Sequence, residues 1–87
     1  MDNLPEVTSV SAHADFSLTI TFANGEVRRF DALPYLDRGI FVRLKNTSVF
    51  KQAYVEHGTV AWRGGLDISP ETLYLKSIDT KNKTSAA

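Results

Sequence analysis

The sequence contains no cysteine, and two targeting features are also missing. Without cysteine the chain has no disulfide, no thiolate nucleophile and no cysteine-ligated metal. It has no apolar run long enough to cross a membrane, and its first residues include acids where a signal peptide has basic residues. We therefore expect a cytoplasmic protein.

An excess of charge of either sign is also lacking, because 10 Lys and Arg residues balance 10 Asp and Glu residues. A balanced chain creates no long-range field that would attract nucleic acid, an anionic membrane or an acidic substrate. A length of 87 residues allows one small core and no large internal cavity, so any site should lie at the surface. We expect a single domain over residues 1–78 and a disordered polar tail over residues 79–87.

The clearest local pattern is the alternation of apolar and polar residues in the segment FSLTITF, which predicts a strand with one buried face. Asn24-Gly25 follows and supplies the positive φ angles of a tight hairpin turn. A two-residue loop would pair Phe22 with Val27, whereas a three-residue loop with a bulge would pair Leu18 with Phe30. The sequence does not choose between these registers.

Shorter elements are expected on both sides of this hairpin. A strand over residues 7–12 would complete an antiparallel meander. After the meander, Asp31 is a candidate N-cap and Gly39 a left-handed stop for a helix of one or two turns. A second short helix is expected from residue 47 to residue 53, and two brief strands should surround His57-Gly58.

The segment VAWRGGLDISPETLY contains the start of the last predicted helix. Ser69 is a good N-cap, Pro70 fits the first helical position, and Gly64-Gly65 allows a tight turn between two strand ends. Local structure does not require the residue types at the remaining polar and aromatic positions, which are Trp62, Arg63 and Asp67. The elements together predict an α+β fold in which an antiparallel β-meander carries short helices and a C-terminal helix.

An ordered set of short segments resembles the bacterial domain-of-unknown-function family 2442 over residues 7–77. The segments are VTSV, LTITFANGEVRRFD, LPYLDRGIFVRL, VFKQAYVEHGTVAW and GLDISPETLY. The resemblance implies a small α+β domain, and it implies that some relatives belong to gene pairs that look like toxin-antitoxin modules. Many members have Trp-Pro-Asn-Gly before the Asp, where this chain has Trp62-Arg63-Gly64-Gly65. The family offers no catalytic residues to transfer.

Residues that would support catalysis are scarce. Nucleophilic catalysis requires a Ser or Thr beside a base, and the histidines, His13 and His57, both fall in predicted turns. Glu56-His57 lacks a companion at a metal-ligand spacing, and Gly64-Gly65 lacks the lysine and serine of a phosphate-binding loop. We predict that the protein is not an enzyme and that it binds no metal and no cofactor.

Binding functions remain, and the aromatic residues favour a protein partner. Exposed aromatics beside an arginine are typical anchors of protein interfaces. We predict a protein-interaction or regulatory module, with an antitoxin-like role as one form of it. Its candidate partner-binding residues are Trp62, Arg63, Asp67, Tyr35 and Phe41. The alternative is nucleic-acid binding through scattered basic residues, which the zero net charge disfavours. Edge strands of a meander can also pair with a second copy, so a homodimer is an open alternative.

Overall fold

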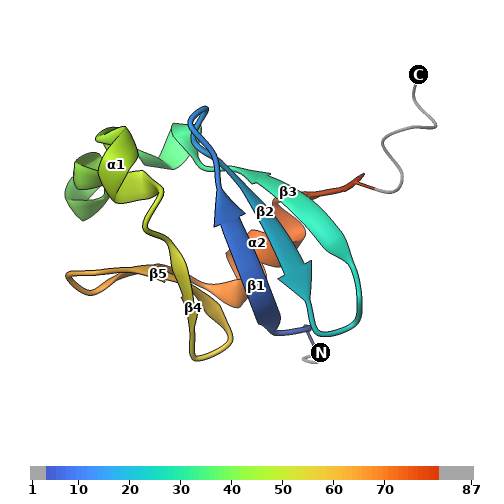
Figure 1. Ribbon diagram of the computed structural model, residues 1–87. Coiled ribbons are helices and arrows are strands. Elements are labelled where there is room, and N and C mark those ends of the chain that lie inside the picture. Colours follow the sequence, from blue (N-terminus) through green and yellow to red (C-terminus); the bar gives the residue numbers. More distant parts are fainter. Residues whose placement is uncertain (1–3, 81–87) are drawn as a thin grey trace, which may run out of the picture.

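The computed structural model describes residues 4–80, which form two small antiparallel sheets connected by short helices (Figure 1). One sheet has the strand order β1-β2-β3-β7 and the other the order β4-β5-β6. The strands are β1 (Val7–Ala12), β2 (Ser17–Phe22), β3 (Val27–Asp31), β4 (Tyr54–Glu56), β5 (Thr59–Trp62), β6 (Leu66–Ile68) and β7 (Ile78–Asp79). The helices are the 3-10 helices η1 (Leu33–Tyr35) and η2 (Gly39–Lys45) and the α-helices α1 (Thr47–Phe50) and α2 (Pro70–Leu75). The predicted α+β fold is confirmed.

The hairpin between β2 and β3 has the three-residue loop. Leu18 lies opposite Phe30, and the Phe22 N–H donates to the Glu26 carbonyl at 2.9 Å. Gly25 has a φ of 92°, the left-handed conformation for which glycine is suited. Leu18 and Phe30 are both fully buried in this register. The bulged alternative is therefore the one that the protein adopts, because it keeps both large side chains on the core face.

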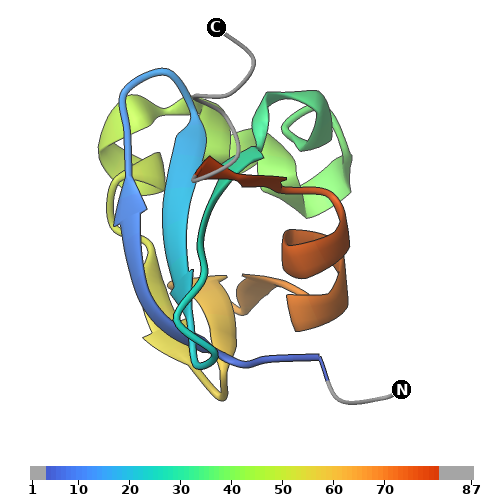
Figure 2. The ribbon, with the colours of Figure 1, turned by 90° about the vertical axis from the view of Figure 1, so that its right-hand side faces the viewer.

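The core lies between the four-stranded sheet and the elements packed on one of its faces. Figure 2 shows α2 to one side of β1, β2 and β3, and Figure 1 shows the same helix behind the sheet. β1 also contacts β4 and β5, and the Val7 N–H donates to the Gly58 carbonyl at 2.9 Å. The two sheets therefore share one core, built from Val7, Leu18, Ile20, Phe22, Phe30, Ala32, Leu36, Leu44, Phe50, Val60, Trp62, Leu66, Ile68 and Leu73.

The segment between the sheets contains more helix than predicted. Gly39 has a φ of 46°, as expected of a left-handed stop, but a further 3-10 helix, η2, begins at this residue. The first cap position falls at Ala32 and not at Asp31, which ends β3. The helix α1 begins at Thr47 as predicted, with Asn46 as its N-cap, but it ends at Phe50 and not at residue 53. The sequence of η2 lacks helix signals, and its buried Leu44 indicates that packing holds it.

The strand β7 includes Asp79, the first residue of the segment that was predicted to be a polar tail. Ile78 and Asp79 pair with the middle of β3, and the Thr80 hydroxyl donates to the Val27 carbonyl at 2.8 Å. A strand of this length has no hydrophobic period to recognise, so the sequence gives no signal for it. The rest of the predicted polar tail, residues 81–87, lies outside the described residues.

The start of α2 carries the predicted cap. The Ser69 Oγ accepts a hydrogen bond from the Thr72 N–H at 3.2 Å. Ser69→Ala removes this acceptor, and we expect the free energy of unfolding to fall by about 1 kcal/mol. Urea denaturation followed by circular dichroism measures the change. Ser69→Asp, which can also cap a helix, should retain the parental stability, and an equal loss in both variants would contradict the capping role.

Candidate functional site

The loop between β1 and β2 presents the carboxylate of Asp15 at the surface. Phe16 has a φ of 66°, a left-handed conformation that is uncommon for a residue with a Cβ. Its ring packs edge-on against Phe50 with the ring centroids 5.3 Å apart, and this contact compensates for part of the strain. The turn brings Asp15 Oδ1 to the Ser17 hydroxyl at 2.6 Å and to the Ser17 N–H at 3.1 Å. The carboxylate is therefore fixed by its own loop.

The strand β3 contributes a cation to the same place. Arg29 Nη2 donates to Asp15 Oδ2 at 2.7 Å. Hydrogen bonding from the Ser17 hydroxyl, supported by the Ser17 N–H and by the charge of Arg29, holds the pKa of Asp15 below its ordinary value of 3.8. The carboxyl is therefore ionised at neutral pH and acts as a fixed anchor for the guanidinium.

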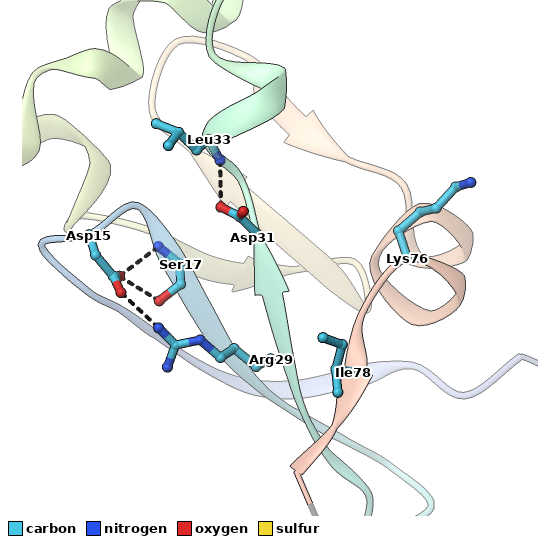
Figure 3. A pocket seen from close by; sticks show the side chains of 7 residues that line it. All are labelled: Asp15, Ser17, Arg29, Asp31, Leu33, Lys76 and Ile78. Carbon is cyan, nitrogen blue, oxygen red and sulfur yellow. Dashed lines mark hydrogen bonds and ion pairs between the residues drawn. The ribbon is translucent and has the colours of Figure 1, made fainter. Parts of the chain in front are cut away.

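A hollow of about 370 Å³ lies beside this ion pair (Figure 3). Its lining residues are Asp15, Ser17, Arg29, Asp31, Leu33, Lys76 and Ile78. Asp31 Oδ1 accepts a hydrogen bond from the Leu33 N–H at 3.1 Å, which fixes the step from β3 into η1. Lys76 follows α2, and Ile78 lies opposite Arg29 in β7. Segments far apart in the sequence therefore form the hollow.

The chemistry of the hollow is mixed. Its lining includes two carboxylates and two cations, so it has no net charge that would select an anion or a cation. Leu33 and Ile78 are 53% and 63% exposed, which is unusual for large apolar side chains that flank one recess. Such a surface can bury apolar groups of a ligand while the charged groups around them fix its position.

The structure separates the residues that the sequence predicted to bind a partner. Trp62 is only 1% exposed, and its indole Nε1–H donates to the Phe50 carbonyl at 2.8 Å. Its assignment as an exposed anchor is wrong, because the single tryptophan fills the core where α1 meets β5. The sequence pattern shows an indole beside a turn but does not show which way it points.

The other four predicted residues reach the surface at separate places. Arg63 and Asp67 are exposed on the hairpin between β5 and β6. Tyr35 and Phe41 are half-buried, and both pack against the core. Tyr35 stacks on Phe30 with the ring centroids 5.3 Å apart, which accounts for its burial. None of the four lines the hollow, and their binding role stays a prediction.

Sequence reasoning missed every residue of the hollow. Asp15 and Ser17 have a usable signal, because an Asp two residues before a Ser is typical of a side-chain-capped turn. The proximity of Lys76 and Ile78 to this turn has no such signal, since it depends on the pairing of β7 with β3. The sequence could therefore have indicated two of the 7 residues that line the hollow.

Within residues 4–80, no group of three or more His, Cys, Asp or Glu side chains is arranged to hold a metal ion. No helix in this part of the chain combines the length and apolarity needed to span a bilayer.

Comparison with known protein families finds a family whose model matches this chain. The family described as "Protein of unknown function (DUF2442)" matches residues 7–79. No curated protein and no solved structure matches the chain. The match covers all strands and helices from β1 to β7, so it extends over the whole fold described above.

Proposed function

Because the chain belongs to the DUF2442 family, which has no assigned activity, we propose a function from the surface itself: a protein-interaction module that binds a segment of a protein partner in the β3–β7 hollow. The observation that carries this proposal is the exposure of Leu33 and Ile78 at one recess ringed by charged groups. Apolar contacts inside a polar rim are the usual anatomy of a protein interface.

The fixed geometry of the hollow supports a recognition role. Arg29 is held by Asp15, and Asp15 is held by Ser17, so this part of the charged rim is arranged before a partner arrives. Binding to preorganised groups loses less side-chain entropy than binding to mobile ones. Lys76 has no ion-pair partner among the described residues, so its ammonium group is available to a carboxylate of the partner.

Nucleic-acid binding is less well supported at this site. Contacts with phosphates need an excess of Lys and Arg, whereas Asp15 and Asp31 balance the two cations of the hollow. The gene pairs implied by the family resemblance give a specific candidate partner, the product of the adjacent gene. An antitoxin-like role and a location in the cytoplasm belong to this proposal.

The test compares three exposed apolar side chains. Leu33→Ser and Ile78→Ser remove apolar contacts from the hollow, whereas Leu75→Ser removes a side chain that is 59% exposed on α2 and does not line it. We expect the first two variants to bind the product of the adjacent gene roughly tenfold or more weakly by calorimetry, because truncated interface anchors have effects of this size. Leu75→Ser should bind as the parent does.

Equal affinities for all three variants would remove the hollow from the interface. Thermal unfolding of each variant controls for folding, since exposed positions should change stability little. If the parent does not bind this product and instead binds a DNA duplex in the same calorimetric assay, the nucleic-acid alternative is favoured.

A further inference from the structure

The tip of the β5–β6 hairpin lies on a different part of the surface from the hollow. Trp62 and Leu66 form its last pair, and Gly64 and Gly65 close the loop with φ angles of 93° and 85°. In Figure 1 this tip lies below the coil formed by η2 and α1. The loop residue with a charged side chain is Arg63, which is exposed.

A second arginine reaches this loop from η2. A Cβ placed on Gly64 would clash with Arg43 Nη2 and would lie 3.2 Å from Arg43 Cζ. The guanidinium of Arg43 therefore rests against the loop backbone at a position that only glycine leaves free. Gly65, with nearly the same φ, has open space in the direction of its missing side chain. The two glycines thus differ in one respect, the contact with Arg43.

Both arginines are available for binding. Neither forms an ion pair with another residue of the described chain. Hydrogen bonding to Glu56 raises the pKa of Tyr54, and the positive charge of Arg63 opposes this shift, which places Arg63 near the Tyr54 phenol. Two arginines from separate elements therefore reach one hairpin tip, and neither has an ion-pair partner among residues 4–80.

The elements that carry or adjoin the two arginines present both apolar and acidic side chains. Ile40 and Val42, which are 62% and 47% exposed, lie on the same 3-10 helix as Arg43. Tyr54, Ala61 and Asp67 lie opposite one another across the sheet, so the exposed Asp67 shares a face with Tyr54. Glu56, bonded to the Tyr54 hydroxyl, adds a second carboxylate to this face.

We infer that Arg43 and Arg63 form a docking site for an acidic segment of a protein partner, with Ile40, one turn of the 3-10 helix before Arg43, contacting an apolar residue of that segment. Guanidinium groups bind carboxylates through paired hydrogen bonds, and both groups here have free donors. A protein segment fits better than nucleic acid, because Glu56 and Asp67 would repel a continuous phosphate backbone whereas a peptide can place its carboxylates only at the arginines. This inference does not depend on the β3–β7 hollow.

The test uses a defined probe, a fluorescein-labelled peptide that alternates Glu pairs with single Leu residues, titrated with the full chain by fluorescence anisotropy. Arg43→Ala and Arg63→Ala should each weaken binding roughly tenfold, the effect of losing one interface anchor. Lys45→Ala removes an equal charge from the same 3-10 helix, one that is already paired with Asp37, and should bind as the parent does. A peptide with Gln in place of Glu should bind roughly tenfold or more weakly than the parent probe.

Gly64 and Gly65 supply a control that changes the position of the Arg43 guanidinium but not its charge. Gly64→Ala and Gly65→Ala introduce the same strain at positive φ, but only Gly64→Ala forces the Arg43 guanidinium to move. Weaker peptide binding in Gly64→Ala alone supports the site, provided that circular dichroism shows both variants folded. Parental affinity in Arg43→Ala and Arg63→Ala would overturn the inference, and so would tighter binding of a labelled thymidine oligonucleotide than of the peptide.

Discussion

Trp62→Ala is expected to lower the free energy of unfolding by about 4 kcal/mol, as large aromatic-to-alanine changes in a packed core do. The indole is buried and packs against Phe50 with the ring centroids 5.7 Å apart. Its Nε1–H donates to the Phe50 carbonyl across the gap between β5 and α1. The substitution therefore leaves a cavity and removes the hydrogen bond that connects α1 to the second sheet.

Urea denaturation followed by far-ultraviolet circular dichroism measures this loss, because the chain has a single Trp and the variant loses its fluorescence signal. Trp62→Phe is the matched control. It keeps most of the ring contact but not the N–H donor, and it should cost about 2 kcal/mol. If Trp62→Ala kept the parental stability but lost partner binding, the result would indicate an exposed indole and would contradict its buried position.

The elements that local rules specify were predictable. The alternation in FSLTITF predicts β2, Asn24-Gly25 predicts the hairpin, and Ser69 predicts the start of α2. Each of these depends on neighbours within a few residues, where side-chain period, turn geometry and capping determine the conformation. The choice between the two hairpin registers lay beyond the local rules, because both loops accept the same Asn-Gly pair.

The features that long-range packing determines were not predictable. Trp62 turns inward because α1 offers a carbonyl acceptor and an aromatic neighbour, and nothing near residue 62 in the sequence indicates this. Phe16 adopts a positive φ that its residue type disfavours, since its ring is needed against Phe50. The contact between Arg43 and Gly64 likewise joins two segments that share no sequence pattern. Both candidate binding surfaces depend on such contacts, which explains why the sequence located only Arg63.

Arg28→Met is expected to lower the free energy of unfolding by about 2 kcal/mol, because several charge-assisted hydrogen bonds are lost from a partly buried position. Arg28 connects β3 to the end of α2: Nε donates to the Ser77 hydroxyl at 2.6 Å and Nη2 to the Ser77 carbonyl at 2.9 Å. Its guanidinium carbon also lies 4.5 Å from the centroid of the Tyr74 ring. Methionine retains the length of the side chain but none of these donors.

The pH dependence of this loss tests whether Glu26 contributes to it, because Arg28 Nη1 also donates to Glu26 at 2.7 Å. Hydrogen bonds from the Tyr74 hydroxyl and from Arg28 hold the pKa of Glu26 below its ordinary value of 4.5. A carboxyl with a lowered folded pKa stabilises the fold above its ordinary pKa, and this contribution disappears as the pH falls through the folded value. The stability difference between the parent and Arg28→Met should therefore be largest above about pH 4.5 and shrink below it.

Arg29→Met, which breaks only an exposed ion pair, should lower the free energy of unfolding much less at every pH. A difference that stays constant through the acid range would show that Arg28 stabilises the fold through Ser77 and Tyr74 alone, without a contribution from Glu26.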